Sequence, residues 1–152
     1  MARFVPLVTA KTVCMGQRQV LRLSQERFTI HDPAPHDERW TIPLVLGPAL
    51  ARSEGGAGNS ADERQVVALT ADAVAMEIPA RRCGDLVKLN LGDLGYYRVA
   101  YDGVPQAALG QGLAAMAPAD RVNLLGDAWA LVEAGRAAPA VYLDLVERIQ
   151  GR

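Results

Sequence analysis

The sequence contains few of the residues that usually carry catalysis, metal binding or attraction to charged surfaces. Only two histidines, two cysteines and 5% aromatic residues occur in 152 residues, and 16 basic side chains nearly balance 17 acidic ones. The resulting net charge of −1 excludes strong electrostatic attraction to nucleic acid or anionic membranes. No apolar run approaches the roughly 20 residues of a membrane-spanning helix, and residues 1–4 lack the apolar core of a signal peptide.

The two cysteines leave the redox environment open. Cys14 and Cys83 are far apart in the sequence, and they fit either one disulfide or two free thiols. Two buried thiols in a reducing compartment are the simpler interpretation, because free cysteine behaves as a small apolar residue. The cytoplasm is therefore slightly favoured, although the compartment stays unknown.

The first two thirds of the chain has the pattern of short β-strands. Half of all residues are hydrophobic, which is enough for a globular core. Alternating or β-branched runs separated by turn residues are typical of an immunoglobulin-like antiparallel β-sandwich with about eight strands. Pro43 lies inside one run and predicts an edge or bulged strand, because proline cannot donate to a ladder. A glycine-rich surface loop is expected over 48–63. The predicted strand regions are 6–15, 19–30, 40–47, 65–70, 74–79 and 88–102.

The last of these regions predicts a β-hairpin that closes the sandwich. Two alternating runs flank the turn residues 92–95, which include two glycines that tolerate a tight reversal. We expect Tyr97, Val99 and Tyr101 to face the core and Arg98 to face outward.

After residue 102 the apolar spacing changes to that of helices. Three helices are predicted, over 105–116, 118–135 and 139–150, each with an apolar stripe. The domains are therefore expected to be a β-sandwich over 1–102 and the first helices of an α-helical domain over 103–152. Three helices are too few to close a domain, so part of their apolar surface should face a partner. The stripes are Leu109, Leu113 and Met116; Val122, Leu125, Trp129 and Val132; and Tyr142, Leu145 and Ile149.

No arrangement of residues in the sequence predicts an active site. His31 and His36 are separated by two prolines, which forbid the helix that would aim both rings at one zinc ion. No elbow motif surrounds the serines, and no phosphate-binding frame surrounds the glycines at 55–58. We therefore expect no catalytic, cofactor-binding or metal-binding residue here. The remaining candidates and their simpler roles are Ser24, Ser53, Ser60 and Cys14 as structural residues; Asp127 with Glu133 and Asp144 with Glu147 as solvated helix faces; and Tyr96, Tyr97 and Tyr101 as core residues in preference to base- or sugar-stacking ones.

The letters of the sequence nevertheless carry a family resemblance. The stretches KLN at 88–90, GYYRV at 95–99 and YD at 101–102 resemble a segment of the aminopeptidase N family of zinc exopeptidases, which includes puromycin-sensitive and endoplasmic-reticulum aminopeptidases. Further blocks resemble the family in the same order: PLVT at 6–9, LSQERF at 23–28, WTIPL at 40–44, DRVNLL at 120–125, DAWAL at 127–131, Gly135 and LDL at 143–145.

This resemblance implies that the chain is a non-catalytic segment. In the family, these blocks form a β-sandwich after the catalytic domain and the beginning of a helical C-terminal domain. It implies that zinc and peptide substrate belong to the parent enzyme, and that the partners of this segment are the catalytic and helical domains of the parent chain. Substrate preference and oligomeric state stay open.

Two other functions stay open at this point. One is a stand-alone immunoglobulin-like binding module that uses its tyrosines, and the other is a scaffold derived from an inactive aminopeptidase. An HExxH segment encoded immediately upstream in frame would support the aminopeptidase.

Overall fold

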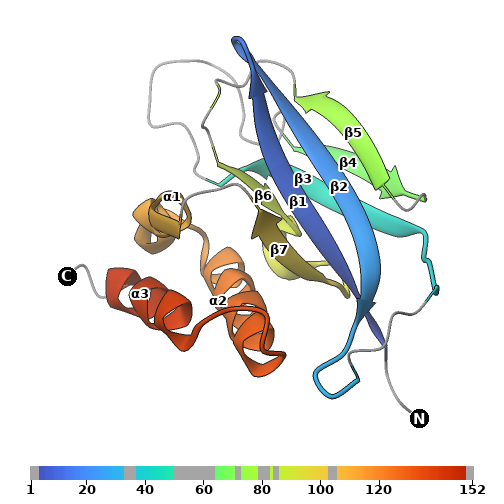
Figure 1. Cartoon of the computed structure of the whole chain (residues 1–152). Helices are drawn as coiled ribbons and strands as arrows, with labels where there is room; N and C mark the ends of the chain where they lie inside the picture. Colours follow the sequence, from blue (N-terminus) through green and yellow to red (C-terminus); the bar gives the residue numbers. More distant parts are fainter. Residues whose placement is uncertain are drawn as a thin grey trace.

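The computed structural model describes residues 4–32, 37–49, 64–70, 73–78, 83, 86–102 and 106–149. Within this part of the chain, seven strands form two sheets and three α-helices follow them (Figure 1). The predicted class, a β-sandwich followed by helices, is confirmed. His36, Ser53, Ser60 and most of the glycine-rich loop lie outside the described residues.

One sheet has four strands in the order β5-β2-β1-β7. Strands β1 and β2 form a long antiparallel hairpin, whereas β7 runs parallel to β1, so the sheet is mixed. The other sheet has the order β4-β3-β6 and is antiparallel. The strands are β1 (Val5–Met15), β2 (Arg18–Phe28), β3 (Ile42–Pro48), β4 (Gln65–Leu69), β5 (Ala73–Ile78), β6 (Val87–Leu89) and β7 (Arg98–Asp102).

The core lies between the two sheets and follows the alternation of their strands. Val8 and Leu21 from one sheet pack with Leu44 and Leu89 from the other. Tyr97 and Val99 are buried in the same cluster and Tyr101 packs against it, which confirms their predicted orientation.

The predicted hairpin over 88–102 is wrong. β6 pairs with β3 and β7 pairs with β1, so the two runs lie in different sheets. A short 3-10 helix, η1 (Leu91–Asp93), carries the chain from one sheet to the other. Local alternation could not reveal this crossover, because each run alternates in the same way whichever strand it pairs with.

The predicted edge position of the Pro43 strand is also wrong, because β3 is the central strand of its sheet. β6 pairs only with Leu46–Pro48, so at Pro43 the strand has a single neighbour, β4. Pro43 therefore lies in a part of β3 where a ladder bond could be lost to one neighbouring strand and not to two.

The helices cover the outer face of the four-stranded sheet near β1 and β7 (Figure 1). Leu7 from β1 and Phe28 from β2 pack there against Ala130 of α2. The first predicted helix ends early: it consists of α1 (Gln106–Gln111) and a separate 3-10 turn, η2 (Leu113–Ala115), with Gly112 between them. The other helices are α2 (Pro118–Glu133) and α3 (Pro139–Ile149).

The cysteines are paired, so the expectation of two buried thiols is wrong. Cys14 and Cys83 form a disulfide with a Cα–Cα distance of 5.5 Å. Cys14 is exposed near the end of β1, beside the tight turn that leads into β2. In the described part of the chain, no helix combines the length and apolar character needed to cross a membrane.

Candidate docking site between strands and helices

Helix α2 turns three polar residues toward the strands, beside the apolar contact made by Ala130. Asp120, Asn123 and Asp127, spaced by one turn each, are all buried, whereas Val122 is 67% exposed and Trp129 is 46% exposed. The apolar stripe predicted for this helix therefore points largely away from the sheet. We use the name docking network for the polar residues that join α2 to the strands: Lys88, Asn90, Asp93, Arg98, Asp120, Asn123 and Asp127.

Lys88 is the most deeply buried charge of the docking network, with 1% of its surface exposed. Its Nζ donates hydrogen bonds of 2.6 Å to the Asn123 side-chain oxygen and to the Leu89 carbonyl. Burial lowers the pKa of Lys88, and the nearby carboxylates of Asp120 and Asp127 oppose that shift. The contact links β6 directly to α2.

Asp127 links the same helix to β7. Its carboxylate accepts a 3.1 Å hydrogen bond from the Val99 backbone N–H and a 3.3 Å bond from the Arg98 guanidinium. Among the described strands β7 lies at the edge of its sheet, so Asp127 satisfies a backbone donor that has no partner strand there. Burial raises the pKa of Asp127 to about 6, although the Arg98 guanidinium pulls it down.

The crossover loop is the third attachment. Asn90 adopts a left-handed conformation with φ of 55°, and its side chain bonds both the N–H and the carbonyl of Gly95. Asp120 accepts the Gly92 N–H at 2.7 Å, and the Asn123 amide donates to Asp93 at 2.9 Å. A loop held at both its backbone and its side chains is fixed relative to α2.

Buried charges of this kind set geometry more than they add stability. The desolvation of two ions costs several kcal/mol, and their attraction only partly repays it. The pKa shifts of Lys88 and Asp127 support this view, because burial is the largest cause of both shifts and disfavours the charged form of each group. The docking network therefore selects one orientation of α2 on the strands.

The other residues singled out in the sequence do not come together. His31 and Glu133 are exposed, and Asp127 is buried instead of solvated, so it forms no carboxylate pair with Glu133. Tyr96 is 71% exposed, whereas burial raises the pKa of Tyr97 to about 12. Among the described ranges, no cluster of three or more His, Cys, Asp or Glu side chains could hold a metal ion.

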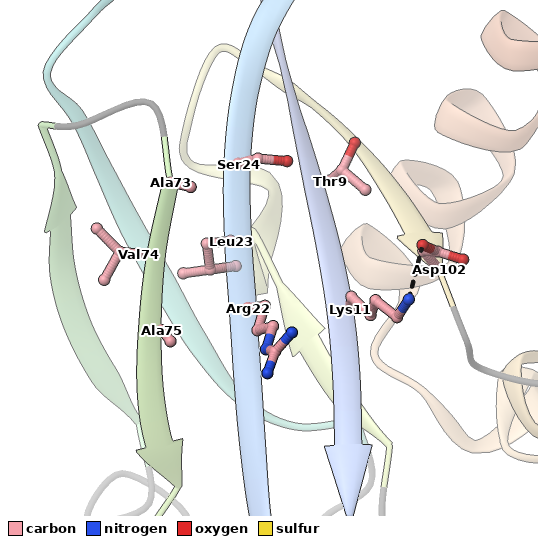
Figure 2. A pocket seen from close by; sticks show the side chains of 9 residues that line it. All are labelled: Thr9, Lys11, Arg22, Leu23, Ser24, Ala73, Val74, Ala75 and Asp102. Atoms are coloured by element: carbon pink, nitrogen blue, oxygen red, sulfur yellow. Dashed lines mark ion pairs between the residues drawn. The ribbon is translucent and has the colours of Figure 1, made fainter.

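A shallow depression of about 420 Å³ lies on the uncovered part of the four-stranded sheet (Figure 2). Its floor is made of small side chains, including Ser24, Ala73 and Ala75. Lys11 and Asp102 form a 4.0 Å ion pair at one side. Asp102, the one carboxylate among the lining residues, is paired with Lys11 and lies across β1 from Ser24 (Figure 2), so the depression presents no nucleophile–base pair.

The docking network was missed at the sequence level, although a signal for it exists. Asp120, Asn123 and Asp127 recur at the spacing of one helix face, and a second, apolar stripe covers another face of the same helix. An ordinary amphipathic helix with a solvated polar face has the same pattern, so the spacing shows which residues share a face but not which face is buried. Several of these residues also lie in the blocks that carry the family resemblance.

Comparisons with known proteins agree with this architecture. A family model described as an ERAP1-like C-terminal domain matches residues 86–152, which include β6, β7 and the helices. The fold and this match define the class as a β-sandwich that leads into a region similar to an ERAP1-like C-terminal domain.

Individual relatives support the same class. The chain is 32% identical over 158 residues to endoplasmic reticulum aminopeptidase 2 of Bos taurus, covering 96% of this chain and 15% of the relative. It is 30% identical to puromycin-sensitive aminopeptidase of Caenorhabditis elegans, covering 86% of this chain and 13% of the relative. It is 28% identical to tricorn protease-interacting factor F2 of Thermoplasma acidophilum, covering 83% of this chain and 13% of the relative. These matches confirm the predicted resemblance: the chain is an aminopeptidase N family fragment, and it spans 13–15% of the length of these relatives.

Proposed function

We propose that this chain is a non-catalytic segment of a zinc-dependent aminopeptidase, whose parent removes N-terminal residues from peptides. Its strands, over 1–102, would space the catalytic domain from a helical domain that begins at 103. The chain itself would supply no catalytic residue, cofactor ligand or metal ligand. Two of the matched relatives are aminopeptidases by name, which supports this assignment.

The docking network is the observation that carries the proposal. Lys88, Arg98 and the loop at 90–97 hold α2 to both sheets through one buried and two partly buried hydrogen bonds. A spacer must transmit position, and buried polar contacts fix orientation more strictly than apolar packing does.

The outward side of the helices supports the partner part of the proposal. Val122, Trp129 and Leu143 are 67%, 46% and 58% exposed, and the Trp129 and Tyr142 rings lie 5.1 Å apart. Clustered exposed apolar residues usually mark contact surfaces. In the parent, further parts of the helical domain would cover this side.

The test is metal content and turnover of the purified 152-residue chain. We expect less than one zinc per ten molecules by elemental analysis, and no hydrolysis of an aminoacyl fluorogenic substrate. Stoichiometric zinc, or turnover abolished by a chelator, would contradict the proposal. In a longer protein that joins this chain to a metallopeptidase domain, Trp129→Glu should lower turnover and the matched exposed change Ala119→Glu should not.

A stand-alone binding module that uses its tyrosines is less well supported. Tyr97 and Tyr101 are held inside the core region, and only Tyr96 of the three is exposed. A single exposed tyrosine does not make a stacking platform.

A further inference from the structure

A partly open, mainly apolar cavity of about 370 Å³ lies between the outer face of the four-stranded sheet and the three helices. Its walls include Leu7, Leu109, Leu124, Leu131, Val141 and Leu145. An apolar cavity of roughly 150 Å³ already holds a benzene molecule, so this one has room for a larger apolar ligand.

One buried carboxylate gives the cavity its chemical preference. Asp127 lines the cavity and is 2% exposed, and it accepts one hydrogen bond from the Val99 N–H and one from Arg98. A carboxylate has about four acceptor sites, so roughly two remain unused. Burial raises the pKa of Asp127 although Arg98 and Lys88 pull it down, in keeping with a carboxylate that a further positively charged donor would stabilise. A further donor carrying positive charge is the group that this position favours.

The other polar lining groups do not favour an anion. Arg136 lines the cavity, but its guanidinium forms an ion pair with Glu26. A bound carboxylate would compete with Glu26 and would share the cavity with Asp127. Thr9, on the sheet side, adds a hydroxyl that can accept from an ammonium group.

We propose that the cavity between the sheet and the helices binds a small apolar primary amine in its ammonium form. The ammonium donates to the Asp127 carboxylate, and the apolar body lies among the leucines of α1, α2, α3 and β1. This site is independent of the proposed spacer function, because it needs neither a parent domain nor a metal ion.

The direct test compares hexylammonium chloride with 1-hexanol on the unmodified chain by calorimetry at pH 7.5. The two probes share their apolar body, so the comparison isolates the charge. We expect saturable 1:1 binding of hexylammonium, at least tenfold tighter than hexanol, with methyl NMR shifts at Leu124, Leu131 and Val141. Equal affinities, or no binding of the amine, would overturn the proposal.

Two substitutions locate the site. Asp127→Asn should weaken hexylammonium at least tenfold and leave hexanol unchanged, whereas Asp144→Asn, an exposed acid on α3, should change neither. Ala128→Phe should fill the cavity and abolish binding of both probes. Unchanged amine affinity in folded Asp127→Asn would refute the assignment; if that variant does not fold, the comparison on the unmodified chain decides.

Discussion

Replacement of Lys88 by methionine is the most informative single perturbation of the docking network. Methionine keeps the length and apolar stem of lysine but removes the ammonium group. That group donates to Asn123 and to the Leu89 carbonyl, both at 2.6 Å, from a site that is 1% exposed. The variant therefore leaves two buried acceptors without their donor while filling nearly the same volume.

The expected cost follows from these contacts. A buried polar group that loses its partner costs about 1–3 kcal/mol, and loss of one member of a buried charged set costs about 3–5 kcal/mol. Burial lowers the pKa of Lys88, so removal of the cation also returns part of its desolvation cost. We expect a net loss of about 2–4 kcal/mol in the free energy of unfolding, out of the roughly 5–15 kcal/mol typical of a domain.

Urea unfolding followed by far-ultraviolet circular dichroism measures this loss. The only other lysine in the chain, Lys11, provides a matched control, because its side chain is 52% exposed in a 4.0 Å surface ion pair. Lys11→Met should change stability by no more than about 0.5 kcal/mol. Adding Asn123→Leu to Lys88→Met removes the acceptor that lost its donor, and also the bond from Asn123 to Asp93. Asp93 is exposed and can bind water instead, so the double variant should recover part of the loss. If Lys88→Met costs no more than Lys11→Met, the docking network does not hold the helices to the strands.

Two further predictions test the crossover loop and the titration of Asp127. Gly95→Ala should destabilise the chain by about 1–3 kcal/mol, because the added Cβ would lie 2.3 Å from the Tyr97 ring. Gly126→Ala, whose Cβ would meet Arg98 at 3.5 Å, should instead stabilise α2 by up to about 1 kcal/mol. If the urea midpoints of both variants fall equally, the crossover loop moves to accommodate the Cβ and the prediction is wrong. Because the pKa of Asp127 is raised, its stabilising contribution is complete below about pH 4 and disappears as the pH rises towards 6, so the chain should lose about 3 kcal/mol relative to Asp127→Asn between pH 4 and pH 7. Parallel unfolding curves of the two proteins across that range would contradict this sign.

The sequence predicted the elements better than their connections. Strand and helix bounds were close because alternation and helical spacing are local properties, as β1 at Val5–Met15 and α2 at Pro118–Glu133 show. Pairing was not local. The runs at 87–89 and 98–102 looked like one hairpin but belong to two sheets, and Pro43 lies in a central strand.

The candidate site could be predicted only in part. The blocks that resemble the family, at 88–99 and 120–131, contain most of the docking network. Nothing in their residue types indicates that Lys88 donates a hydrogen bond to Asn123. The pairing of Cys14 with Cys83 depends likewise on where β1 ends relative to a distant segment.

The sequence by itself determined the class of fold, the order of strands and helices, and the resemblance to aminopeptidases, because these depend on periodicity and on residue identities along the chain. Only the tertiary structure decided which face of α2 is buried. The apolar stripe through Val122 and Trp129 looked like the core side, yet Asp120, Asn123 and Asp127 face the strands. The reason is physical: the edge strand β7 and the crossover loop present unpaired backbone N–H groups, and only polar side chains can satisfy them.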